Sequence, residues 1–258
     1  MVSALGYVGS IVGPIVGGVL ASAYGLFLPF LLAIPLMAVA IALILVKLQK
    51  GEVTSKKAVA SLTEVREAMS IDKGIVILIV VAVVGQFFNE FGNPYYFIFL
   101  ESSLKASGFV MGLTQSMLSV GSVVVALPAG HLLDIFRRRK PFFVLSSLLA
   151  TVGVGLTAFA VSSLMVVASY FLFGLSNTLL MISLQTYFAE IAGIRKSLVF
   201  GAYQAATWVA GIPAPPIAGF IAETYGLRGV FVVNFVGLLI ALSVLAILFN
   251  EKNRKTSR

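Results

Sequence analysis

The side chains that could do chemistry in this sequence lie inside long apolar stretches. Glu90 is the one acid within such a stretch, and Gln86, Asn89 and Asn93 accompany it at the spacing of one helical face. Amide and carboxyl groups cost free energy in an apolar medium, so we expect them to face a cavity or a neighbouring helix. The same reasoning extends the candidate solute or ion pathway to Gln115, Asn177, Gln185 and Gln204. Trp208 is a further candidate, because its ring could contact a solute, although anchoring at the membrane interface is the more common role of such aromatic residues.

Two roles are open for Glu90. Burial favours the protonated carboxylic acid, so this group could take up and release a proton. It also lies 16 residues beyond Gly74, roughly 24 Å along a helix, where it could equally hold an outer gate through hydrogen bonds to asparagine or tyrosine. Pro94 is expected to kink or break the same helix.

The sequence has few of the residues and motifs that nucleophilic catalysis, metal binding or ATP hydrolysis require. It contains no cysteine and a single histidine, His131. It also lacks a Gly-Lys-Ser/Thr phosphate loop and a paired-histidine metal motif. We therefore expect no enzymatic activity, no metal, no cofactor and no ATP-driven pump.

Long apolar runs indicate that these residues are carried by membrane helices. Hydrophobic residues make up 59% of the chain and charged residues only 11%, against about 25% in a typical soluble domain. Neither 1–46 nor 141–189 contains a charged residue or histidine, and each run is too long for one crossing of a hydrocarbon core about 30 Å thick. The predicted class is an all-α polytopic membrane protein. Its eight predicted transmembrane helices are 5–22, 27–46, 74–99, 109–129, 142–161, 164–187, 199–222 and 229–249.

Basic residues are concentrated in alternate connecting segments. Of the 18 Lys and Arg residues, only Lys105 and Arg228 lie elsewhere. The basic segments are 47–73, 130–140, 188–198 and 251–258. Because basic loops stay on the cytoplasmic side, we expect both termini to lie inside a plasma membrane. Topology thus accounts for the net charge of +8, and no nucleic-acid partner is needed.

A block of glycines and prolines occurs twice, about 202 residues apart. It begins at Gly9 and at Gly211, and each copy ends in Tyr-Gly-Leu, at Tyr24 and Tyr225. Six predicted helices fit within one period, so the repeated unit has six helices. We therefore expect four further helices ahead of Met1 that this chain does not carry.

The repeat divides the chain into four parts. Residues 1–46 are the last two helices of a first unit, and residues 74–250 are a complete second unit. Segment 47–73 joins them as a cytoplasmic loop, either a solvated linker or a short amphipathic helix with a capping box at Ser61–Glu64. Residues 251–258 form a basic cytoplasmic tail.

Two motifs resemble those of the major facilitator superfamily. The first has the pattern Gly-x3-Gly-Pro-x2-Gly-Gly, which is found most often in proton-coupled antiporters of that family. Its residues are Gly9, Gly13, Pro14, Gly17 and Gly18. The second is similar to the family's short cytoplasmic loop motif, and departs from it at Ile135 and Arg137. Its residues are Gly130, Asp134, Arg138 and Arg139.

The resemblance implies a major facilitator fold with a complete C-terminal half, working as a secondary transporter by alternating access. It places three helices, 27–46, 142–161 and 229–249, on the outside of the bundle, where they face lipid. It places the helices that carry most of the amides around the pathway. The first motif favours proton-coupled export of small organic molecules, with lipid, substrate and protons as partners. An uptake symporter and a non-transporting membrane fragment are the alternatives, and a partner chain could supply the four absent helices.

Each motif also has a physical role that follows from its residues. The three glycines spaced four apart from Gly9 leave a bare stripe, which predicts either a tight, proton-sealing contact between the halves or ordinary glycine packing. Pro14 removes one helical hydrogen bond. Asp134 is predicted to lock one conformation by facing basic residues or a helix N-terminus, whereas the basic run after Phe136 anchors the loop at the membrane.

Overall fold

A computed structural model describes residues 2–25, 27–47, 73–136, 138–192 and 196–249. These residues form helices joined by short turns, and no strand occurs among them. The helices are α1 (Val2–Tyr24), α2 (Phe27–Lys47), α4 (Lys73–Gly92), α5 (Tyr95–Ser102), α6 (Gly108–Ile135), α7 (Lys140–Ala158), α8 (Ser163–Ala192), α9 (Lys196–Gly211) and α10 (Ala214–Leu248). Most of the predicted loop 47–73, with its capping box, and the tail 251–258 lie outside the described residues.

Two of the predicted helices are interrupted. The range 74–99 is divided at Asn93–Pro94 into α4 and α5, which confirms the break expected at Pro94. The range 199–222 is divided between α9 and α10 by a turn at Ile212 and Pro213 that the hydropathy pattern alone does not predict. α10 then continues through Gly226, whose φ of 77° separates two apolar segments.

Six helical segments of the described chain are long and apolar enough to cross a membrane. They are Phe27–Val46, Val76–Ser102, Gly108–Leu133, Lys140–Ala158, Ser163–Glu190 and Ser197–Leu248. The last has 52 residues, roughly 78 Å of helix, and therefore fits two crossings of a core about 30 Å thick. Val8–Tyr24 is a shorter apolar helix. The all-helical membrane class is confirmed, and eight crossings stay a prediction.

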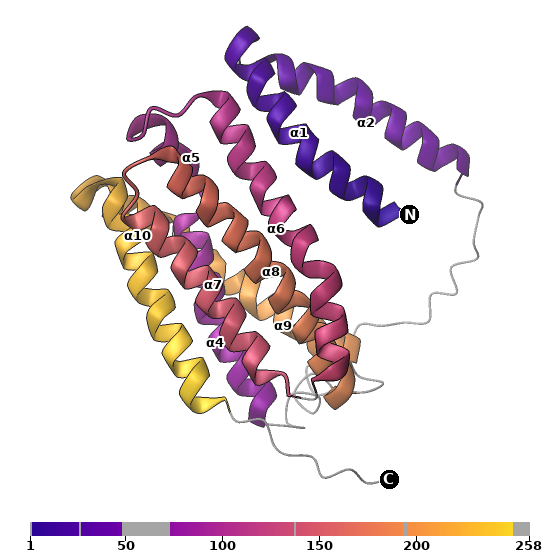
Figure 1. Cartoon of the computed structure of the whole chain (residues 1–258), viewed down its shortest axis with the longest axis vertical. Coiled ribbons are helices and arrows are strands. Elements are labelled where there is room, and N and C mark those ends of the chain that lie inside the picture. Colours follow the sequence, from indigo (N-terminus) through magenta and orange to yellow (C-terminus); the bar gives the residue numbers. More distant parts are fainter. Residues whose placement is uncertain (1, 26, 48–72, 137, 193–195, 250–258) are drawn as a thin grey trace.

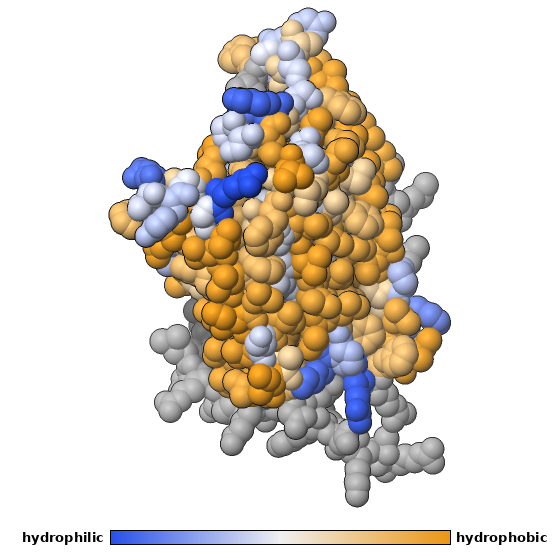
Figure 2. Space-filling view, turned by 60° about the vertical axis from the view of Figure 1, so that its left-hand side comes forward, coloured by the Kyte–Doolittle hydropathy of each residue, from blue (hydrophilic) through white to orange (hydrophobic). Residues whose placement is uncertain are grey.

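Hydrophobic side chains cover the outside of the molecule. Figure 2 shows a broad hydrophobic surface, with hydrophilic residues gathered toward its upper and lower parts. α2 is the extreme case, because every residue from 30 to 46 is exposed. Exposed apolar area on this scale suits lipid tails and would be unstable in water.

The second unit is a bundle in which α6 lies against α8 and α7 packs against both α8 and α10 (Figure 1). α4 packs on α9 and α10, and α1 lies along the free side of α6 with α2 outermost. Aromatic clusters hold the two ends of this bundle. Phe143, Tyr187 and Phe249 meet at one end, and Tyr96 and Phe231 meet at the other.

The two copies of the repeated block share a backbone feature. Gly25 has a φ of 85° and Gly226 a φ of 77°. These are the matched glycines of the two Tyr-Gly-Leu sequences, and φ values in this range are strained for any residue with a Cβ atom. The internal repeat is therefore expressed in local structure as well as in sequence.

Candidate functional site

A cavity of about 440 Å³ lies inside the bundle formed by α4 to α10. Its lining includes Phe143 and Leu245 from one end cluster, and Tyr96 and Tyr170 from the other. The cavity therefore extends along the bundle between the two aromatic clusters. Its volume falls within the range of sites that hold small organic molecules, about 300–1,000 Å³.

Amide side chains from four parts of the chain converge on the cavity. The structure brings together five of the predicted pathway residues: Gln86, Asn89, Asn93, Gln115 and Asn177. Gln86 and Asn89 come from α4, Asn93 from the turn before α5, and the other two from α6 and α8. Because these helices are far apart in sequence, only their packing gathers the amides around one space.

The other four predicted pathway residues do not line the cavity. Glu90 lies beside it, where Gln86 Nε2 donates a 2.9 Å hydrogen bond to Glu90 Oε1. Its side chain instead packs on α9, since a Cβ atom at Gly211 would be 2.8 Å from Glu90 Cγ. Trp208 is 63% exposed and Gln185 is exposed, so neither contacts the cavity. Gln204 is half-buried but also lies outside its lining.

Two helices expected to face lipid also contribute to the lining. α7 provides Ser146, Ser147 and Thr151, and the second segment of α10 provides Asn234. The expectation for 142–161 and 229–249 is therefore wrong for one face of each helix. The signal was present in the sequence, because Asn234 is a polar residue in the middle of an apolar span, and spans rarely carry one without a partner.

An aromatic wall borders part of the cavity. The ring centroids of Tyr96 and Tyr170 are 5.3 Å apart, and those of Tyr96 and Phe173 are 5.6 Å apart, both in edge-to-face geometry. All three residues are among the lining residues. Rigid rings of this kind offer a large apolar contact area for a flat solute.

α1 and α6 approach closely through glycine, but not through the predicted stripe. A Cβ atom at Gly18 would lie 2.2 Å from the Gly108 carbonyl oxygen, whereas Gly9, Gly13 and Gly17 have no atom within 4 Å of that position. The face of α1 that packs against α6 therefore carries Pro14 and Gly18 rather than the stripe of Gly9, Gly13 and Gly17. Two residues of the motif, Pro14 and Gly18, thus lie in the contact between α1 and α6, and the predicted proton seal stays a prediction.

Pro14 explains why serines of α6 lie in this contact. Proline has no N–H to donate to the carbonyl four residues earlier, which is that of Ser10. Ser119 Oγ donates to this Ser10 oxygen at 3.2 Å, and Ser116 Oγ donates to the Ile11 oxygen at 2.6 Å. Ser119 thus donates to the carbonyl that Pro14 leaves without its helical donor, and Ser116 adds a second hydrogen bond between the two helices.

In the second copy of the repeat, the matching glycines are covered. Gly211 faces Glu90 of α4, and a Cβ atom at Gly219 would be 3.0 Å from Tyr95 Oη of α5. Tyr95 Oη also donates to the Pro215 oxygen at 3.2 Å. In the second copy, the glycine face of this block therefore packs against α4 and α5. In the first copy, the matching residues Gly9 and Gly17 have no described atom within 4 Å of an added Cβ atom.

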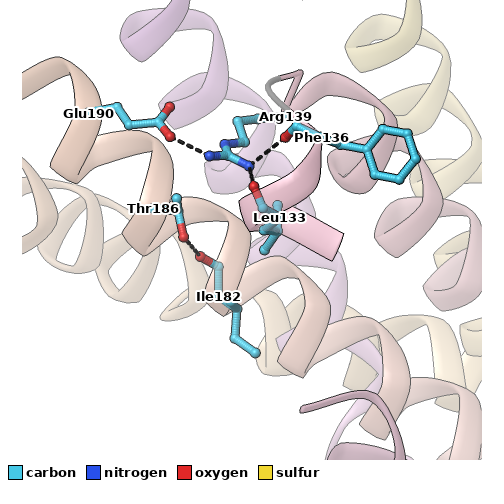
Figure 3. Close-up of polar contacts among 6 residues, drawn as sticks. All are labelled: Leu133, Phe136, Arg139, Ile182, Thr186 and Glu190. Atoms are coloured by element: carbon cyan, nitrogen blue, oxygen red, sulfur yellow. Dashed lines mark hydrogen bonds and ion pairs between the residues drawn. The ribbon is translucent and has the colours of Figure 1, made fainter. Parts of the chain in front are cut away.

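The second motif forms a polar contact between α6 and α8 (Figure 3). Arg139, whose side chain is 7% exposed, donates from Nη1 to the Phe136 oxygen at 2.8 Å and to the Leu133 oxygen, and from Nη2 to Glu190. Arg139 is therefore a buried side chain that links the end of α6 to α8, rather than a membrane anchor. Arg138 is exposed, and a Cβ atom at Gly130 would meet open space. The Asp134 side chain is outside the described atoms, so its locking role stays a prediction.

No group of three or more His, Cys, Asp and Glu side chains is placed to hold a metal ion in the described parts of the chain.

Comparison with known proteins adds two findings. A sequence model of the Major Facilitator Superfamily matches residues 78–258. The chain is also similar to "Multidrug resistance protein MdtG" of Proteus mirabilis (strain HI4320), with 25% identity over 235 residues. This match covers 86% of the chain and 56% of the relative, so the chain spans about half the length of the curated relative it matches.

Proposed function

The chain belongs to the Major Facilitator Superfamily, and from that premise we propose that it is part of a secondary transporter that exports a small organic molecule in exchange for protons. The observation that carries the proposal is the cavity of about 440 Å³, lined by amides and aromatic rings in the interior of a membrane bundle. Polar groups are costly inside a bilayer, and a solute pathway is the usual reason for their presence there.

Three features support the finer parts of this proposal. The relative's name refers to multidrug resistance, which fits outward movement of organic molecules. The Gly-Pro motif of α1 resembles that of proton-coupled antiporters. Glu90 accepts a hydrogen bond from Gln86, a lining amide, and this bond connects a protonatable group with the cavity. A proton bound by Glu90 would therefore weaken the hydrogen bond that holds a lining side chain, because a neutral carboxyl group is a poorer acceptor than a carboxylate.

We also propose eight crossings with both termini on the cytoplasmic side of a plasma membrane. The support is the distribution of basic residues and the 52-residue apolar segment that turns at Gly226. The transport unit is proposed to include two further helices, which pack against Gly9 and Gly17 as α4 and α5 pack against the matching glycines of the second copy. The second copy supports this, because its matching glycines are covered by those two helices.

Transport by membrane vesicles tests the proposal. Inside-out vesicles that contain the protein should accumulate one of a panel of cationic dyes, uncharged aromatic amides and sugars when a proton gradient is imposed. Accumulation in right-side-out vesicles instead would identify an uptake symporter, and no accumulation in either would contradict transport.

A matched pair of variants tests the cavity as the pathway. Asn177 lines the cavity and Gln185 does not, although both are exposed amides on α8. Asn177→Leu should lower the transport rate and Gln185→Leu should leave it unchanged. Equal effects of the two substitutions would show that the cavity is not the route.

A further inference from the structure

The repeated glycine–proline block is covered on a different face in each of its two copies. In α1, the face with Pro14 and Gly18 packs against α6, and the glycine stripe is uncovered by described residues. In the second copy, α4 and α5 cover the glycines, and the face that corresponds to Pro14 and Gly18 is exposed. This open face consists of Ile212, which is 72% exposed, the exposed Pro216, and Phe220, which is 68% exposed. Each copy therefore leaves open the face that the other copy covers.

The open face carries a backbone carbonyl that has no hydrogen-bond donor. Pro216 has no N–H, so the Ile212 oxygen cannot receive the helical hydrogen bond from the residue four positions later. Within the described residues, no other group donates to this oxygen. Ile212 is the sixteenth of 26 residues in the uncharged run 197–222, so it lies inside the hydrocarbon layer. A carbonyl without a donor is costly there, because lipid tails cannot donate a hydrogen bond.

In α1, another helix satisfies the matching carbonyl. Ser10 corresponds to Ile212 in the repeat, and Pro14 leaves the Ser10 oxygen without its helical donor. Ser119 Oγ of α6 donates to that oxygen at 3.2 Å. α6 can approach this closely because of Gly112, where a Cβ atom would be 2.2 Å from the Pro14 oxygen. A helix with glycine at the point of approach and serine beside it therefore completes the first copy of the block.

The six-helix repeat predicts that this contact occurs twice in the transport unit. α1 is the fifth helix of the first unit, and α6 is the second helix of the second unit. Parallel repeats are related by an axis along the membrane normal, and an interface across such an axis uses the same patch on both units. The reciprocal contact therefore pairs the fifth helix of the second unit, which carries the open face, with the second helix of the first unit.

We propose that the open face binds the second helix of a first six-helix unit. That helix is apolar and carries the pattern Gly-x3-Gly-x3-Ser-x2-Ser, which α6 shows from Gly108 to Ser119. One of its serines donates to the Ile212 oxygen, and its glycines leave room for Phe220, which stands where α1 has Gly18. This adds a third helix to the two already proposed for the transport unit, and it rests on the repeat rather than on transport.

Binding of a peptide to the full chain in phosphatidylcholine vesicles tests this inference. The peptide has the sequence of residues 105–136, which contains α6, and carries a donor fluorophore at its N-terminus. The acceptor fluorophore is attached at Glu223→Cys, an exposed position about one turn beyond Phe220 in a chain that has no cysteine of its own. Energy transfer should increase with peptide concentration and saturate, because the bound peptide places its N-terminal end near Phe220, as Gly108 lies near Gly18.

A matched pair of peptides distinguishes this contact from non-specific helix association, and neither alters the chain. A peptide with both Ser116→Ala and Ser119→Ala should bind about three- to tenfold more weakly, the value of hydrogen bonds between membrane helices. A peptide with Thr114→Val should bind like the original, because that hydroxyl donates within α6, to the Val110 oxygen.

A matched pair of chain variants tests the carbonyl. Pro216→Ala supplies the N–H that the Ile212 oxygen lacks, so it should weaken peptide binding by about threefold. Pro35→Ala, in the exposed helix α2, should leave binding unchanged. Circular dichroism checks that both variants keep their helix content.

Several outcomes would overturn the inference. They are energy transfer that does not saturate, equal binding of the Thr114→Val and serine-free peptides, or equal binding by the Pro216→Ala and Pro35→Ala chains. Transfer between two labelled copies of the chain that the peptide does not reduce would also overturn it, because a second copy would then cover the open face. Failure of the transport assay with peptide binding intact would contradict transport and leave this interaction surface in place.

Discussion

Replacement of Gly112 by alanine is expected to separate α1 from α6. A Cβ atom at this position would lie 2.2 Å from the Pro14 carbonyl oxygen and 2.9 Å from its carbonyl carbon. Both are backbone atoms of a helix, so no side chain can rotate away. Restoring an ordinary separation of about 3.4 Å requires the helices to move apart by about 1 Å.

That movement removes the hydrogen bonds of the contact as well. The Ser116–Ile11 distance would grow from 2.6 Å to about 3.6 Å, and the Ser119–Ser10 distance from 3.2 Å to about 4.2 Å, both beyond hydrogen-bonding range. Hydrogen bonds between membrane helices average about 0.6 kcal/mol, and a forced misfit costs about 1–3 kcal/mol. The expected loss in the free energy of unfolding is therefore about 2–4 kcal/mol.

Equilibrium unfolding by SDS in mixed micelles measures this loss, with Gly13→Ala as the matched control. Gly13 is also a helical glycine of the α1–α6 pair, but no atom lies within 4 Å of a Cβ atom built on it. Gly13→Ala should be neutral or stabilising by up to about 1 kcal/mol, because alanine favours the helix. Equal losses in the two variants would refute the assignment of the packing face.

Two further predictions concern charged residues. Arg139→Lys should lower the free energy of unfolding by about 1–2 kcal/mol, because a single ammonium cannot replace the guanidinium bonds to the Leu133 and Phe136 oxygens and to Glu190. Thermal unfolding measures the change, and Arg138→Lys, at an exposed neighbour, should have little effect. Glu90→Gln should preserve folding, since glutamine still accepts from Gln86, but should abolish most of the gradient-driven transport in vesicles. A variant that transports normally would leave Glu90 with a gating or structural role.

Much of the architecture could be predicted from the sequence because lipid permits few backbone arrangements. A chain segment within a bilayer must satisfy its own N–H and C=O groups, so apolar runs of sufficient length indicate helices directly. The break at Pro94 follows from the missing N–H of proline. Each Tyr-Gly-Leu copy lies between one predicted helix and the next, and the glycine of each copy has a positive φ. Polar residues inside these runs identified most of the amides that line the cavity.

The packing faces, in contrast, were decided by the tertiary structure. The sequence indicated a glycine stripe in α1, yet Gly18 and the Pro14 carbonyl form the contact with α6. It placed 229–249 toward lipid, yet Asn234 lines the cavity, and it treated Arg139 as an anchor, yet that side chain is buried against α8.

The reason is that these helices are apolar all round. In water, the side of a helix that faces the core is marked by hydrophobic residues, but lipid tails are as apolar as leucine and leave no such mark. The rotation of each helix about its axis is therefore set by backbone approach at glycine, by carbonyls freed by proline and by buried polar groups. These interactions depend on residues far apart in the sequence, and only the folded bundle brings them together.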